Sequence, residues 1–202
     1  MDEMHKQANA ILWLHDMLMT YYHALMFSEP SEEDKNTLAY KDISVYINQY
    51  LADNVKRHKI MLDDLFSCKI VSELDHILQS PIVYLDNVSS YTYACEKNSF
   101  GCFYDDPVAN EWSNNMIHID YGPRRSDIVL GLVFSLRLTQ KLIYLNQDFV
   151  VMMQYNSERI DSVKVSFYLP RRNYPDLYDI HAINDAGYGR LLLITNTNAT
   201  SL

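Results

Sequence analysis

The most constraining feature of this sequence is a change, near residue 80, in the spacing of its apolar residues. Before that point they recur every three or four residues, as they do along one face of a helix. After it, short runs rich in Val, Ile, Tyr and Thr prevail, as in strands. This change predicts an α+β fold, with N-terminal helices followed by a mostly antiparallel sheet.

The helical part spans about residues 1–80 and the sheet part about residues 81–195. Four helices are predicted, at 3–27, 41–58, 61–66 and 71–78. Six strands are predicted, at 81–85, 89–95, 116–121, 149–155, 162–169 and 190–195. Residues 96–115 have the composition of a loop, and no linker composition separates the two parts. We therefore expect a single domain over residues 1–202.

One further helix is predicted inside the sheet part, at about residues 127–144. It is apolar on nearly every side, which predicts a buried helix that crosses the sheet. The two strands that follow it are separated by a short polar segment, so we expect them to pair as an antiparallel hairpin under this helix.

Composition limits the classes of partner. The 202 residues carry a net charge of −9, which disfavours nucleic acid as a partner. The charge is uneven, because residues 1–120 hold 19 acidic and 8 basic side chains while residues 121–202 hold 7 and 9. We therefore expect an acidic surface that suits a basic partner protein, although chance and solubility explain the same imbalance.

The location is predicted from three absences. The first residues lack a secretory signal, and the longest apolar run, residues 128–136, is too short for a membrane span. Cys68, Cys95 and Cys102 are odd in number and irregularly spaced. They predict free thiols in a cytoplasmic protein without a disulfide framework.

No phosphate-binding loop, zinc motif or nucleophile motif occurs, so we expect no cofactor. Cys102, His118 and Asp120 are the candidate catalytic group, since cysteine catalysis needs a thiolate, a base and a residue that orients the base. A packed free cysteine explains the same residues. His15 and His23 lie two helical turns apart, which is wide for a zinc site, and no metal site is predicted.

Two arginine pairs are candidate anion-binding residues. Arg124 and Arg125 precede the apolar helix, and Arg171 and Arg172 follow a predicted strand. Guanidinium groups near a helix N-terminus bind phosphate or carboxylate, and both pairs would meet if the two element ends converge at one sheet edge. Ordinary solvated turns are the alternative interpretation.

Aromatic and acidic residues crowd the segment 84–112. Tyrosine and tryptophan dominate interface contacts, and acidic neighbours suit a basic partner. The predicted partner-binding residues are Tyr91, Tyr93, Glu96, Phe103, Tyr104, Asp105, Asp106, Glu111 and Trp112. The alternative is that these aromatic residues belong to strands and to the core.

These patterns favour a small acidic binding protein that docks onto another protein and inhibits or escorts it. Its most concrete form is a bacterial immunity protein against a toxin domain. One alternative is an enzyme, a cysteine-dependent hydrolase or a transferase that uses Cys102 and His118. Another is a secretion chaperone or dimeric subunit that associates through helix 3–27, with Trp13 and Tyr21 supplying an exposed patch.

Overall fold

The computed structural model describes residues 3–28, 43–85, 90–93, 105–145, 147–155, 162–171, 173–174, 177, 182–184 and 189–196. Its helices are α1 (Glu3–Ser28), α3 (Gln49–Arg57), α4 (Leu62–Ser67), α5 (Ser72–Gln79), α6 (Pro107–Asn114) and α7 (Arg124–Ile143). Its strands are β1 (Ser44–Ile47), β2 (Ile82–Leu85), β3 (Ser90–Tyr93), β4 (Ile117–Ile119), β5 (Val150–Tyr155), β6 (Val163–Tyr168) and β7 (Arg190–Thr195). The predicted α+β class is confirmed. None of the described helices is both long enough and apolar enough to cross a membrane.

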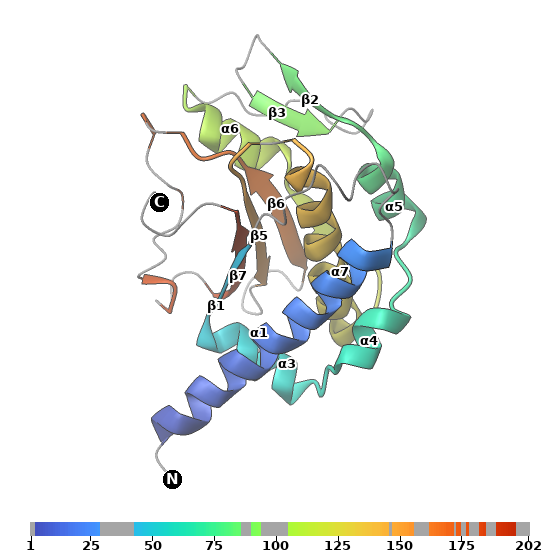
Figure 1. Ribbon diagram of the computed structural model, residues 1–202, viewed down its shortest axis with the longest axis vertical. Coiled ribbons are helices and arrows are strands. Elements are labelled where there is room, and N and C mark those ends of the chain that lie inside the picture. The colour runs from blue at the N-terminus through green and yellow to red at the C-terminus, as the bar shows by residue number, and fades with distance from the viewer. Residues whose placement is uncertain are drawn as a thin grey trace.

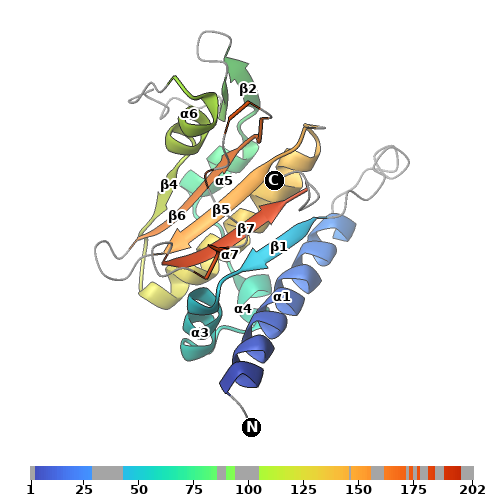
Figure 2. The ribbon, with the colours of Figure 1, turned by 90° about the vertical axis from the view of Figure 1, so that its left-hand side faces the viewer.

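A five-stranded antiparallel sheet forms the centre, in the order β1-β7-β5-β6-β4 (Figures 1 and 2). The predicted hairpin is confirmed, because β5 pairs with β6 from Val150 opposite Tyr168 to Tyr155 opposite Val163. Strands β2 and β3 pair with each other as a two-stranded sheet of their own and form a separate hairpin at one end of the molecule.

Helix α7 packs against one face of this sheet, as its apolar sequence predicts. Gly131 allows the close approach, because a Cβ atom at this position would lie 2.6 Å from Val163 Cγ1 and 3.1 Å from Met153 Cε. The buried hydroxyl groups of α7 bond within the helix; for example, Ser135 Oγ donates to the Gly131 carbonyl at 2.7 Å. The helix therefore enters the core without leaving this polar group unsatisfied.

Helices α1, α3 and α4 lie on the same side of the sheet as α7 (Figure 2). Leu14, Leu18 and Tyr22 face the core from α1. Tyr21, which we expected on an exposed patch, is only 3% exposed and packs against Phe66 with ring centroids 5.2 Å apart. Trp13 is partly buried against the same core. The prediction of an exposed patch is therefore wrong for Tyr21, while association through this helix stays a prediction.

The predicted helix 41–58 is wrong in its first part, where β1 pairs with β7. Helix α3 begins only after Asn48, whose Oδ1 accepts from the N–H groups of Leu51 and Leu191, each at 3.0 Å. Its Nδ2 donates to the Gly189 carbonyl at 2.6 Å. The buried side chain of Asn48 thus caps α3 and joins it to a strand more than 140 residues later. Strand β1 therefore belongs to the sheet, although it lies in the part that we expected to be helical.

The predicted loop 96–115 is wrong where α6 begins. Asp106 caps this helix, since its Oδ1 accepts from the N–H of Val108 at 2.8 Å, and Pro107 occupies the first helical position. Helix α6 contacts β6 and β3 and covers part of the second face of the sheet. Trp112 packs there against a smaller core cluster of Val108, Val150, Met152, Tyr168, Ile183, Leu191 and Leu193.

Candidate functional site

The hairpin β2–β3 and helix α6 carry most of the predicted partner-binding residues that the structure describes. Glu96, Phe103 and Tyr104 lie outside the described residues. Tyr93 is 1% exposed and packs edge-on against Phe167, with ring centroids 5.2 Å apart. Burial removes Tyr93 from any contact surface of this structure, because its ring belongs to the core.

Glu111 is also buried, and it joins three elements. Its side chain is 0% exposed. Oε1 accepts from the Tyr91 N–H at 2.8 Å and from Arg171 Nη2 at 2.6 Å, while Oε2 accepts from the Leu169 N–H at 2.7 Å. Burial raises the pKa of this carboxyl, and its backbone donors and Arg171 oppose the rise. Glu111 therefore holds the hairpin on the body, and it does not belong to an acidic rim.

The backbone of Tyr91 is fixed on both sides. Besides the bond to Glu111, its carbonyl accepts from Asn115 Nδ2 at 2.9 Å. The Tyr91 ring packs against that of Tyr84 across the hairpin, with ring centroids 5.0 Å apart, and Tyr84 is 46% exposed. We call the pair Tyr84 and Tyr91 the tyrosine edge.

Two acidic residues, Asp105 and Asp106, precede α6, and Asp105 is exposed.

The two arginine pairs do not converge. Strand β4 pairs with β6 so that Ile119 lies opposite Val163, which places Arg124 and Arg125 near the end where β6 begins. Arg171 follows the other end of β6. Six residues of strand separate the two ends by roughly 17–20 Å, so one small anion cannot contact both pairs.

Arg125 is also engaged locally, and so is Arg171 through Glu111. Arg125 Nη2 bonds Asp64 Oδ2 at 2.7 Å, and Nε donates to the His58 carbonyl at 3.0 Å. These contacts tie the start of α7 to the segment between α3 and α4. Arg125 and Arg171 are thus each already paired with a carboxylate, and Arg172 lies outside the described residues, so the anion-binding role of the arginine pairs stays a prediction.

The candidate catalytic group is not assembled in the part of the chain that the structure describes. Cys102 lies outside it. His118 is exposed on β4, and its Nδ1 lies 3.5 Å from Ser162 Oγ. Burial and the neighbouring Lys164 lower the pKa of His118. Asp120 shows no hydrogen bond to His118, so within the described ranges no carboxylate is seen to orient this histidine.

The described residues also contain no group of three or more His, Cys, Asp or Glu side chains that could hold a metal ion. His15 Nδ1 lies 3.5 Å from Oδ1 of its neighbour Asp16, and His23 is exposed on the same helix.

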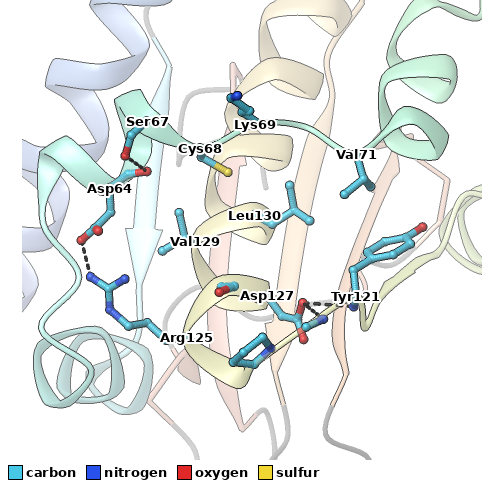
Figure 3. Close-up of a pocket in the computed structure, with 13 residues that line it drawn as sticks. Asp64, Ser67, Cys68, Lys69, Val71, Tyr121, Arg125, Asp127, Val129 and Leu130 are labelled. Carbon is cyan, nitrogen blue, oxygen red and sulfur yellow. Dashed lines mark hydrogen bonds and ion pairs between the residues drawn. The ribbon is translucent and has the colours of Figure 1, made fainter.

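A cavity of about 430 Å³ lies at the start of α7, opposite the segment that joins α4 to α5 (Figure 3). Apolar side chains line one part of it and polar side chains the rest; the lining includes Cys68, Val71, Tyr121, Arg125, Asp127, Val129 and Leu130. Figure 3 shows the Lys69 ammonium directed away from Tyr121 and Asp127. The volume and the mixed lining are typical of a site for a small ligand.

The thiol of Cys68 in this cavity is not activated as a nucleophile. Cys68 is a free thiol, as predicted, and burial raises its pKa, with Arg137 opposing the rise. A thiol with a raised pKa is a poor nucleophile at neutral pH. Cys95 lies outside the described residues, as Cys102 does. The cavity therefore suits non-covalent binding rather than cysteine catalysis.

Asp127 has a structural role in the same cavity. It is 3% exposed, and its Oδ1 accepts from the N–H groups of Tyr121 and Gly122, each at 3.1 Å. Burial raises the pKa of its carboxyl, the two backbone donors oppose that rise and Asp120 adds to it. The carboxylate fixes the turn that starts α7.

No known protein family model matches this chain, and neither the curated proteins nor the solved structures include a match to it. The function must therefore be inferred from the geometry of the chain itself.

Proposed function

We propose that this protein is a binding module that docks onto another protein through the tyrosine edge. The observation that carries the proposal is the pair Tyr84 and Tyr91 on a hairpin outside the main sheet. A large aromatic ring exposed to 46% is costly to leave in water, and it contributes strongly when a partner buries it.

The hairpin is held in place before any partner arrives. Glu111 and Asn115 bond the N–H and the carbonyl of Tyr91, so helix α6 fixes the strand that carries one of the two rings. A contact residue that is already ordered loses little entropy on binding. This arrangement supports a docking surface at the hairpin, since an isolated two-stranded hairpin is only marginally stable in water.

The expected partner is a protein with a basic surface. The net charge of −9 attracts such a partner at long range, and Asp105 is exposed just before the helix that supports the hairpin. Inhibition or escort of that partner, with a toxin domain as the most concrete case, is the function we propose for the complex.

Capture from a native lysate with matched variants tests this proposal. Tyr84→Ser removes the exposed ring of the tyrosine edge. Tyr50→Ser is the control, because Tyr50 on α3 has the same exposed fraction of 46% and lies elsewhere on the molecule. We expect the wild type and the control to retain one protein that Tyr84→Ser loses, with all three folded at the temperature of the assay. Equal retention by both variants would contradict the proposal.

A further inference from the structure

A second cavity lies further along α7, between this helix and α5. Its volume is about 450 Å³. It is lined by Asp75, Leu78, Gln79, Arg137, Gln140, Lys141 and Tyr144. We call it the α5–α7 pocket. Two of its lining residues are cations one helical turn apart, on a helix that is otherwise mostly buried.

Arg137 lines this pocket, and one of its donors is unsatisfied. Its Nε is buried and has no hydrogen-bond partner, and Arg137 forms no ion pair with any residue that the structure describes. A guanidinium group is charged at every physiological pH and can only donate. Since Arg137 has no counter-ion among the described residues, the pocket that its guanidinium group lines favours an anionic ligand.

Lys141 places a second positive charge on the same wall. Its ammonium group donates to the carbonyls of Leu78 and Ser80, where α5 ends. Carbonyl groups at a helix C-terminus attract a cation, which fixes the position of this ammonium. Arg137 and Lys141 stand at positions i and i+4 of one helix, so both side chains lie on the same face of α7.

The remaining polar groups leave room for an anion. Asp75 is the carboxylate of the lining, and its Oδ2 accepts from Gln79 Nε2 at 2.7 Å. Gln140 Nε2 donates to the Leu25 carbonyl at 3.4 Å, toward α1. Tyr144 is 51% exposed at the end of α7, and with Leu78 it supplies surface for an organic group. The charged side chains of the lining add up to one net positive charge.

We propose that the α5–α7 pocket binds a small organic phosphate, with its oxyanion on Arg137 and Lys141 and its organic part against Leu78 and Tyr144. A doubly charged phosphate matches two cations better than a carboxylate does. This site is separate from the tyrosine edge, so either proposal can fail without the other.

Calorimetric titration of the full chain with phenyl phosphate tests the site. Benzoate is the second probe, because it has the same ring and a single negative charge. Arg137→Met removes the unsatisfied donor and keeps an unbranched side chain. Arg57→Met is the control, since it removes an equal charge from an exposed position on α3.

We expect saturable binding of phenyl phosphate at one site, with benzoate at least about tenfold weaker. Arg137→Met should weaken phenyl phosphate at least about tenfold, and Arg57→Met less than about twofold. Equal weakening by the two variants, equal affinity for the two probes or no saturable binding would each overturn the proposal.

Thermal melting without ligand separates binding from a structural role. If Arg137 serves ligand binding and not the stability of the fold, Arg137→Met should melt at the wild-type temperature or above, because it deletes an unsatisfied buried donor. Phenyl phosphate should then raise the melting temperature of the wild type and of Arg57→Met more than that of Arg137→Met. A large loss of melting temperature in the unliganded variant would show a structural role and overturn the proposal.

Discussion

Glu111 shows how a single buried carboxylate changes the interpretation of a whole segment. In the sequence it stands among aromatic and acidic residues that suggest an interface, yet three bonds to Tyr91, Leu169 and Arg171 make it an internal tie. Its neighbours decide its role, and two of these three lie about 60 residues later in the chain.

Glu111→Gln should therefore destabilise the fold. It leaves the Arg171 guanidinium without its carboxylate in a mostly buried position, and breaking a buried pair typically costs about 3–5 kcal/mol. Urea unfolding measures the change, with Asp105→Asn as an exposed control expected within about 0.5 kcal/mol of the wild type. A loss as small as that of the control would refute the internal tie.

His58 should make the free energy of unfolding depend on pH. Partial burial lowers its pKa in the folded state, and Arg124, Arg57, Arg125 and Arg190 lower it further. The unfolded chain then binds more protons, so stability should fall as pH drops below the unfolded pKa of about 6.5. Denaturation between about pH 7 and pH 5 measures this slope.

In His58→Gln this contribution to the slope should disappear. A proton NMR titration of His58 should also show its pKa rising with added salt, because salt screens the arginine charges. A His58 pKa at or above 6.5 that does not change with salt would contradict the lowering of this pKa by the four arginine side chains.

At the scale of elements, the sequence predicts best where a segment determines its own environment. Helix α7 is apolar on nearly every side, and β5 and β6 flank a short polar segment, so these three were predicted correctly. Strand β1 was taken for helix because Ile43, Tyr46 and Ile47 also fit a helical face. Its pairing with β7 depends on a partner about 150 residues away, which local spacing cannot show.

The site residues follow the same division. Asp106 before Pro107 is a local helix start signal, and it would have located α6. Burial of Tyr93 depends on contact with Phe167 on a distant strand, so no pattern in the segment predicts it. Arg137 and Lys141 stand at i and i+4, a spacing that reveals the pair but not the pocket beside it.

The contact of α7 with the sheet should be sensitive to one methyl group. Gly131→Ala places a Cβ atom 2.6 Å from Val163 Cγ1, which forces the helix or the strand to move at a cost of about 1–3 kcal/mol. Gly122→Ala is the control, because no atom lies within 4 Å of its added Cβ. Chemical denaturation that gives equal stabilities would mean that α7 sits further from the sheet.

At the scale of the whole molecule, net charge and the tyrosine edge should govern different steps of binding. Charges across the surface steer the approach of a basic partner, and salt screens them beyond about 10 Å near 0.1 M. The association rate with the captured partner should therefore fall as salt rises, while the dissociation rate changes little. A biosensor measures both, and a salt-independent association rate would count against a basic partner.

The dissociation rate of the Tyr84→Ala complex tests docking at the tyrosine edge most directly. A ring that anchors an interface contributes about 2 kcal/mol or more, so the complex should dissociate roughly 30 times faster than that of the wild type. Tyr50→Ala should dissociate at the wild-type rate, and both variants should remain folded at the temperature of the measurement. If Tyr84→Ala left the dissociation rate unchanged, the tyrosine edge would not be the surface that binds the partner.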